Sequence, residues 1–278
     1  MSEIFLVSLA AMGGTGILFG VLITYTSKKF AVQKDERIGD IEKVLPGANC
    51  GACGYPGCSA YAEAIVAEGV SITMCPVGGA SVASQVGQIM GIQADDSSVP
   101  MVARVKCGGG KNCIDSFAYR GIQDCHAANA LHKGFQACKY GCLGLGNCVV
   151  KCPFDAIIIN QNGVAEIDEN KCTGCGVCIK ECPKAVIELA SKDSKVHVLC
   201  KNLEKGKDVR QKCKTGCIAC KLCEKACQYG AIKVENNVAV IDYSKCTNCN
   251  ACVQKCPTRA IANLSDKLAD AACDKCVI

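Results

Sequence analysis

The residues of this chain that could do chemistry are its cysteines, of which the 278-residue sequence holds 27. In residues 172–183, four cysteines follow the spacing C-x2-C-x2-C-x3-C-P. Thiolates spaced in this way bind [4Fe–4S] clusters, with three sulfurs on one cluster and the fourth on a second cluster. Gly174 and Gly176 give the loop the backbone freedom to turn its sulfurs inward. The run therefore predicts a pair of neighbouring clusters.

Two further runs repeat this spacing, and each has the same exchange of its fourth ligand. We expect one cluster on Cys217, Cys220, Cys223 and Cys256, and another on Cys227, Cys246, Cys249 and Cys252. A degenerate run upstream, with Cys142, Cys148 and Cys152, lacks one cysteine. There we expect one cluster on Cys152, Cys172, Cys175 and Cys178. The other should lie on Cys142, Cys148 and Cys182, with Cys138 in place of the missing ligand.

A different cysteine set lies near the N-terminus, where Cys50, Cys53, Cys58 and Cys75 follow the spacing C-x2-C-x4-C-x16-C. Glycines separate the first three, which suits a loop folded closely around one self-contained [4Fe–4S] cluster. The sequence thus predicts five clusters. A sixth could be drawn from Cys107, Cys113, Cys125 and Cys200, while Cys213, Cys273 and Cys276 are expected to be free thiols.

Two other kinds of site compete with this interpretation. Zinc sites usually combine two C-x2-C pairs across a long spacer, and zinc stays the alternative for the N-terminal set. Disulfide frameworks are typical of small secreted domains. An odd number of cysteines, arranged in runs of three or four within eleven residues, favours iron–sulfur clusters over both.

The composition agrees with small modules held together by metal. Trp is absent and aromatic residues make up 5% of the chain, so large aromatic cores are not expected and cluster binding should contribute to folding. The formal charge of +5 omits the clusters. Each cluster with its four thiolates carries about −2, so five would make the loaded protein acidic. Nucleic-acid binding is therefore not indicated.

Residues 4–26 contain no charged residue and predict a transmembrane helix. Basic residues follow at Lys28, Lys29, Lys34 and Arg37, which places the bulk of the chain in the cytoplasm, on a single-pass anchor in the cell membrane. Four glycines in this stretch would permit close packing against a membrane partner. A secretory signal peptide, the competing interpretation, would carry a basic segment before the apolar one.

The elements around the cysteines form an internal repeat. Cys125-x12-Cys138-x3-Cys142 in one half matches Cys200-x12-Cys213-x3-Cys217 in the other. Each half should contain a hairpin and a later strand; the expected strands are 156–159, 164–167 and 185–189, then 231–234, 238–241 and 260–262. The fold class is α+β. The expected parts are an anchor (1–27), a linker (28–45), a [4Fe–4S] module (46–80), a connector (81–104) and two ferredoxin-like two-cluster modules (105–190 and 191–278).

Other features point to partners rather than to catalysis. Residues 192–214 carry eight basic side chains, which form either a solvated loop or a docking patch for an acidic electron carrier. His126, His132 and His197 stand in no ligand spacing and are expected at the surface. Neither a dinucleotide-binding glycine motif nor a Walker loop occurs, and no catalytic residue is assigned.

The residues alone indicate a membrane-anchored chain that conducts electrons between partners. The chain closely resembles the B subunit of the Rnf complex. The resemblance lies in the order of one span, the segment 46–58 (PGANCGACGYPGC), Cys75-Pro76 and then the ferredoxin runs. The segment 141–146 (GCLGLG) resembles its longer, clostridial-type versions. This resemblance implies a translocase component that takes electrons from reduced ferredoxin and passes them to membrane partners, on the way to NAD⁺. Flavin and NAD sites would lie on other subunits.

Two functions of other classes stay open. One is a membrane-tethered polyferredoxin that reduces a redox-sensing regulator without pumping ions. The other is a protein that stores zinc or iron.

Overall fold

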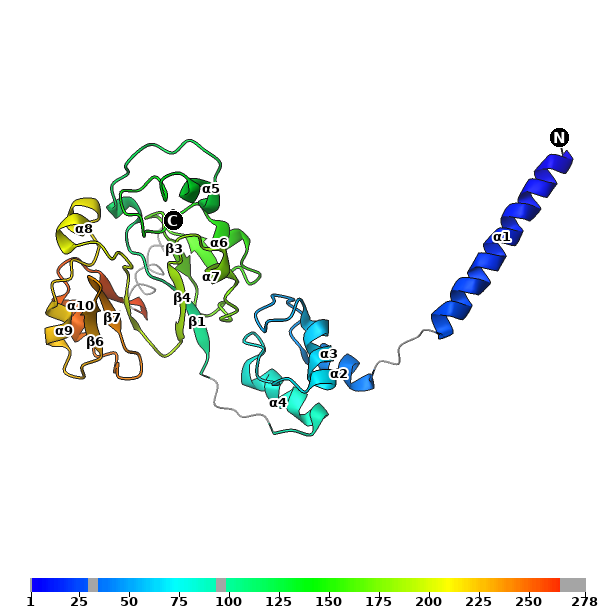
Figure 1. The fold of residues 1–278 in the computed structure, drawn as a ribbon. Coiled ribbons are helices and arrows are strands. Elements are labelled where there is room, and N and C mark those ends of the chain that lie inside the picture. Colours follow the sequence, from blue (N-terminus) through cyan, green and yellow to red (C-terminus); the bar gives the residue numbers. More distant parts are fainter. Residues whose placement is uncertain (1, 30–34, 94–98, 266–278) are drawn as a thin grey trace, which may run out of the picture.

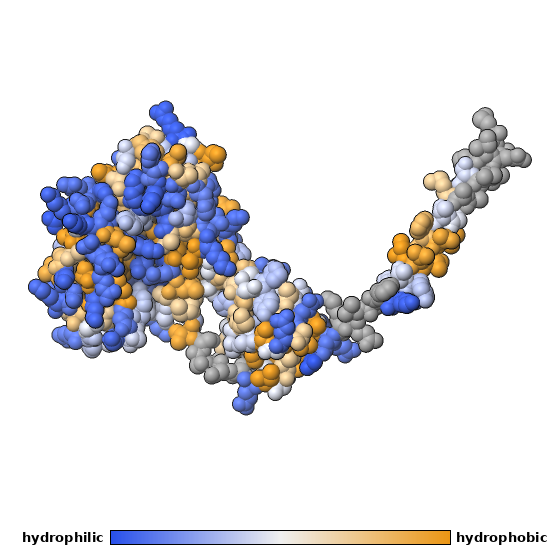
Figure 2. Space-filling model, viewed as in Figure 1, coloured by the Kyte–Doolittle hydropathy of each residue, from blue (hydrophilic) through white to orange (hydrophobic). Residues whose placement is uncertain are grey.

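The computed structural model describes residues 2–29, 35–93 and 99–265 (Figure 1). The first element is the helix α1 (Ser2–Lys29), which ends in Lys28 and Lys29. Large apolar side chains between Met12 and Tyr25 are exposed and form a continuous hydrophobic surface (Figure 2). Among the described residues, no helix has the length and apolar character needed to cross a membrane. The predicted transmembrane anchor is thus not confirmed.

The next part is a small helical module made of α2 (Glu36–Val44), α3 (Cys58–Glu68) and α4 (Gly79–Met90). Asp35 caps α2 by accepting a hydrogen bond from the backbone N–H of Arg37. Ile41, Tyr61, Ile65 and Val86 form the core, in which each is at most 1% exposed. These helices bury one apolar face each, and so fix the loop that carries Cys50 and Cys53.

The first half of the remaining chain contains two two-stranded antiparallel sheets. The strand β1 (Met101–Val105) pairs with β4 (Ile187–Ser191), and β2 (Ile157–Ile159) forms the predicted hairpin with β3 (Ala165–Ile167). Gly163 takes a positive φ of 72° in the hairpin turn, as the Asn-Gly signal predicts. Short helices hold the cysteine loops: η1 (Gly110–Asn112), α5 (Cys125–Ala130), α6 (Asn147–Val150) and α7 (Val177–Glu181).

The second half repeats this arrangement. The strand β5 (Val196–Val198) pairs with β8 (Ile261–Asn263), and β6 (Ile232–Glu235) forms a hairpin with β7 (Val238–Ile241). The helices are α8 (Gly206–Lys212), α9 (Leu222–Ala226) and α10 (Ala251–Lys255). In each half an early strand pairs with the last one, so the chain between them closes around one core. Figure 1 shows the two halves side by side.

Backbone hydrogen bonds join residues 107–114 to the second half. Cys113 forms an isolated antiparallel bridge with Cys213, and the Ile114 N–H donates to the Lys212 carbonyl at 2.9 Å. The Gly108 N–H also donates to the Leu199 carbonyl at 2.9 Å. Residues 107–114 therefore pack against the second half although they follow β1 of the first.

Candidate iron–sulfur sites

The described cysteines are all free thiols, and most are buried or half-buried; Cys220 and Cys249 are exposed. Cys273 and Cys276 lie outside the described residues. In residues 2–29, 35–93 and 99–265, no three His, Cys, Asp or Glu side chains are close enough together to hold a single metal ion. The cysteine sets described below are therefore defined by shared cavities, shared apolar clusters and the mutual effects of their sulfurs.

The regular run of the first half gathers Cys172, Cys175 and Cys178 with Cys152. Burial, followed by the charges of Cys172, Cys175 and Cys152, raises the pKa of Cys178 to about 12. Gly176 takes a positive φ of 74° just before α7, where the chain turns between the second and third cysteines. The Ala103 N–H of β1 donates to the Cys172 sulfur at 3.4 Å. These four cysteines are the set expected from the spacing.

The second set of the first half differs from the expected one. A cavity is lined by Cys125, Cys142, Cys148 and Cys182. Burial, followed by the charges of Cys142, Cys125 and Cys182, raises the pKa of Cys148 to about 12. Cys125 begins α5, whose cap Asp124 accepts from the Asn147 side chain at 2.5 Å. The structure thus brings Cys125, rather than Cys138, into the cavity with Cys142 and Cys148.

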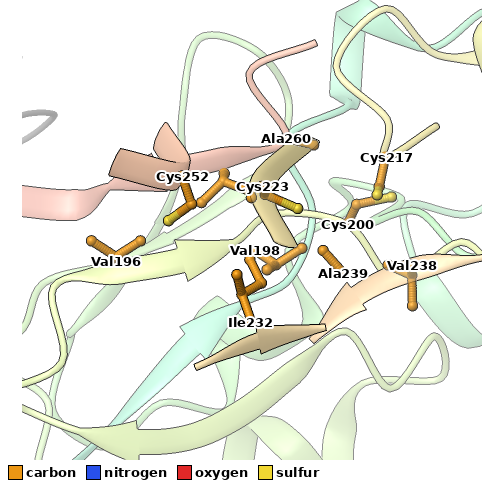
Figure 3. Packing of buried hydrophobic residues seen from close by; sticks show 11 residues of the cluster. Val196, Val198, Cys200, Cys217, Cys223, Ile232, Val238, Ala239, Cys252 and Ala260 are labelled. Carbon is orange, nitrogen blue, oxygen red and sulfur yellow. The ribbon is translucent and has the colours of Figure 1, made fainter. Parts of the chain in front are cut away.

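The two sets of the second half follow the expected exchange. Burial, followed by the charges of Cys217, Cys220 and Cys256, raises the pKa of Cys223 to about 12. The other set, Cys227, Cys246, Cys249 and Cys252, lines one cavity. The Ala231 N–H donates to the Cys227 sulfur at 3.3 Å. Figure 3 shows Cys217, Cys223 and Cys252 around the core of β5, β6 and β7, with Cys200 next to Cys217.

The N-terminal set lies in the loops of the helical module. Burial raises the pKa of Cys75, and the thiolates of Cys50 and Cys53 raise it further. Cys58 begins α3, and its N–H donates to the Asn49 side chain at 2.8 Å. The Gly78 N–H donates to the Cys75 sulfur at 3.4 Å. Cys50 also lies close enough to Cys175 for its thiolate to raise the pKa of that group, after burial.

The expected sixth set is not brought together. Cys125 lies in the cavity with Cys142, while Cys107 and Cys113 line a different cavity together with Cys138 and Cys213. Cys200 also lines the second cavity, where burial and the charges of Cys217 and Cys138 raise its pKa to about 11. Sequence reasoning missed this grouping because its four members come from three separate segments.

The donor chemistry and the backbone around the sulfurs fit [4Fe–4S] clusters. Backbone N–H groups donate to the sulfurs of Cys75, Cys107, Cys172 and Cys227. Such bonds stabilise negative charge on a ligating sulfur and tune the reduction potential of a cluster. A Cβ at Gly174 would meet the Met101 carbonyl oxygen at 2.4 Å, so glycine allows β1 to pack on this cysteine loop. Thiolates in largely apolar surroundings supply the ligands, and at Gly174 the loop leaves no room for a larger residue.

The histidines occupy different environments. His126 Nε2 lies 3.3 Å from the Glu181 carboxylate at the surface, and His132 is exposed. His197, which the sequence placed at the surface, is 2% exposed. Its ring nitrogens contact the Tyr243 hydroxyl and the Ser194 carbonyl, both at 2.8 Å. The surface prediction is wrong for His197 because the residue lies on β5, whose three side chains are all buried.

Comparison with known proteins agrees with these sites. Three family models match: a putative Fe-S cluster family at residues 45–77, a 4Fe-4S binding domain at 165–188 and a 4Fe-4S dicluster domain at 216–260. The B subunit of the ion-translocating oxidoreductase complex from Methanosarcina acetivorans is 44% identical, over 94% of this chain and 99% of that protein. The chain belongs to this family of B subunits. It carries several [4Fe–4S] clusters.

Two other relatives are similar over most of their length. The B subunit of the Na⁺-translocating ferredoxin:NAD⁺ oxidoreductase complex of Acetobacterium woodii is 46% identical, over 94% of this chain and 79% of that protein. The B subunit of the proton-translocating ferredoxin:NAD⁺ oxidoreductase complex of Clostridium ljungdahlii is 46% identical, over 91% of this chain and 90% of its own. The family resemblance seen in the sequence is confirmed.

Proposed function

We propose that this chain is the electron-transfer subunit of an ion-translocating ferredoxin:NAD⁺ oxidoreductase, which accepts electrons from reduced ferredoxin and passes them to other subunits. The observation that carries the proposal is the combination of family membership with a succession of buried cysteine sets from residue 50 to residue 256. No cysteine, histidine or carboxylate here is assigned to catalysis. The chain contributes to the reaction as a conductor within a translocase.

Five ligand sets support this conduction. They are Cys50, Cys53, Cys58 and Cys75; Cys125, Cys142, Cys148 and Cys182; Cys152, Cys172, Cys175 and Cys178; Cys217, Cys220, Cys223 and Cys256; and Cys227, Cys246, Cys249 and Cys252. A bound [4Fe–4S] cluster supplies one-electron redox chemistry. The chain positions each ligand, excludes water from most of the sulfurs and donates backbone N–H groups to several of them.

The exchange of fourth ligands keeps the two sets of each half close together. Cys182 follows directly from α7, which carries Cys178, yet it lies in the cavity with Cys142. Cys256 follows α10 in the same way and lies near Cys223. Each of these short helices thus carries a ligand of one set and leads directly into a ligand of the neighbouring set. The proximity of Cys50 to Cys175 extends the succession from the first half to the N-terminal module.

The N-terminal helix supplies the membrane contact in this proposal. Residues 4–26 carry no charge, and the described apolar side chains of α1 have no protein surface to cover them. Lys28 and Lys29 end the helix, which favours placing the cysteine modules on the cytoplasmic side. The partners are then the membrane and the flavin- and NAD-binding subunits of the complex.

Reduced ferredoxin is proposed to dock on α8 and the residues around it. Lys205, Lys207, Arg210 and Lys214 are exposed there, while Lys212 is held by Glu204 at 2.5 Å. Positive charge on one exposed helix attracts an acidic carrier and raises the encounter rate. Val209 of the same helix is fully buried and lines the cavity with Cys213. The basic surface therefore lies directly over a group of cysteines.

The test uses the anaerobically purified full chain and reduced ferredoxin. We expect rapid bleaching of the cluster absorbance on mixing, and co-purification of the native protein with multi-span, flavin-bearing subunits. A chain that ferredoxin reduces but that co-purifies only with a regulator would support the tethered polyferredoxin instead. A colourless protein loaded with zinc would overturn the proposal.

A further inference from the structure

We propose that Cys107, Cys113, Cys138 and Cys213 bind one further [4Fe–4S] cluster, which joins the two halves of the chain. The inference rests on the proposed electron-transfer function and adds a site to it. Neither the spacing of the cysteines nor the three matching family models covers this set, because the models match residues 45–77, 165–188 and 216–260.

The first observation is that four sulfurs converge in one buried cavity. Cys113, Cys138 and Cys213 form an apolar cluster of their own, in which each is 8% exposed. Cys113 forms an antiparallel bridge with Cys213, and both pack with Cys138. Cys107 lines the same cavity. Single free cysteines are often buried, but four cysteines around one cavity also match the number of ligands that a [4Fe–4S] cluster needs.

Two glycines lie beside the sulfurs of Cys107, Cys138 and Cys213. A Cβ built on Gly109 would lie 3.4 Å from the Cys213 sulfur and 3.6 Å from the Cys107 sulfur. A Cβ on Gly141 would lie 3.7 Å from the sulfurs of both Cys107 and Cys138. A side chain at either position would narrow the space that the cysteines surround. The backbone at both glycines therefore borders the space between these sulfurs.

Hydrogen-bond donors lie beside two of these sulfurs, as they do at Cys75, Cys172 and Cys227. The Cys142 N–H donates to the Cys107 sulfur at 3.3 Å, and the Asn202 side-chain amide donates to the Cys138 sulfur at 3.4 Å. The Thr215 hydroxyl lies 3.5 Å from the Cys213 sulfur and donates to the Gly108 carbonyl at 2.8 Å. Asn202 is 1% exposed, and its amide also donates to the Glu204 carboxylate at 3.1 Å. Donors of this kind stabilise thiolates that are bound to a metal cluster.

The internal repeat explains where the ligands come from. Cys138 and Cys213 occupy equivalent positions, each four residues before the first cysteine of a run. The segment with Cys107 and Cys113 crosses between the halves and supplies the other two ligands. Each half therefore contributes one equivalent cysteine to a site that neither half could complete. The site lies beneath α8, whose C-terminal end leads directly into Cys213.

A disulfide is the main competing use of these sulfurs. Cys113 and Cys213 are paired in an antiparallel bridge, but Cys113 is equally engaged by Cys138. A disulfide between any two would leave the other two buried without a partner. A four-sulfur site uses all of them.

The experiment counts clusters in the anaerobically purified full-length chain. Native mass spectrometry, together with iron and acid-labile sulfide assays, should give six clusters and about 24 irons per chain, at four irons per cluster. Cys113→Ala and Cys213→Ala should each lower the count to about 20. Cys200→Ala is the matched control, because Cys200 is buried beside the same cavity, and it should keep about 24.

The outcomes separate this site from the function on which it rests. A wild-type mass that corresponds to five clusters would overturn the site, and this measurement needs no variant that might misfold. Loss of four irons from Cys200→Ala but not from Cys113→Ala would also overturn it. If the protein holds six clusters but mixing with reduced ferredoxin does not bleach them, the site stands and the proposed function is overturned.

Discussion

The guanidinium of Arg104 forms an ion pair with Glu169 at 2.6 Å between Nη1 and Oε1, and their side chains are only 4% and 8% exposed. Arg104 lies on β1, while Glu169 lies in the loop that leads to Cys172. Lys195, just before β5, approaches the other carboxylate oxygen at 3.9 Å. One buried pair thus ties the first strand to a cysteine loop, and approaches the second half as well.

Breaking this pair should destabilise the fold. Arg104→Met leaves the Glu169 carboxylate buried without its cation, which typically costs about 3–5 kcal/mol. Arg104→Met with Glu169→Leu removes both charges and should recover most of that loss. The midpoint of anaerobic urea unfolding, followed by circular dichroism, measures the difference. Equal destabilisation by the single and the double variant would show that the charge itself is not the cause.

The burial of His197 should make stability depend on pH. Burial lowers the pKa of His197 from 6.5 to about 4. The folded protein therefore holds this ring neutral, while the unfolded chain binds a proton below about pH 6.5, so stability is complete above that pH and falls as the pH drops toward 4. The charged or titratable groups around it are Arg104, Glu169, Lys106 and Tyr243.

The measurement is the unfolding midpoint at pH 7.5 and pH 5.5 under anaerobic conditions. The wild type should lose stability over this range, on the order of 1 kcal/mol for one proton taken up per unit of pH. His197→Asn should lose less, because it has no group that titrates there. His126→Asn is the control, since His126 is half exposed, and it should behave like the wild type.

Iron content can distinguish the ligand set that includes Cys125 from the set with Cys138 that the spacing predicts. Cys125→Ala and Cys138→Ala should each remove one cluster, of about four irons. If the two cysteines serve different clusters, the double variant should lose about eight irons. If Cys138 is the fourth ligand of Cys142, Cys148 and Cys182, and Cys125 is a free thiol, then Cys125→Ala should keep its full iron content.

How much of this architecture was predictable depends on how far apart the interacting residues lie in the sequence. The hairpins and the regular runs were predicted because a turn signal or a fixed spacing lies within about twelve residues. The pairing of β1 with β4 joins residues about ninety apart, and no local pattern marks it. Cys125 was missed for the same reason, since it reaches its cavity through the packing of Asp124 on Asn147. His197 was misplaced because a single histidine does not show that its strand is buried on both faces.

Reversing charge on α8 should slow reduction by ferredoxin. Lys205→Glu with Lys207→Glu replaces two exposed positive charges by negative ones, and should lower the second-order rate at low ionic strength roughly tenfold or more. The effect should shrink as salt is added, because exposed charges are screened over about 10 Å at 0.1 M. Stopped-flow bleaching of the cluster absorbance measures the rate. Lys151→Glu with Lys180→Glu makes the same charge change at exposed positions of the first half and should leave the rate nearly unchanged. A rate that is unaffected by the α8 variant, or lowered equally by the control, would place the docking surface elsewhere.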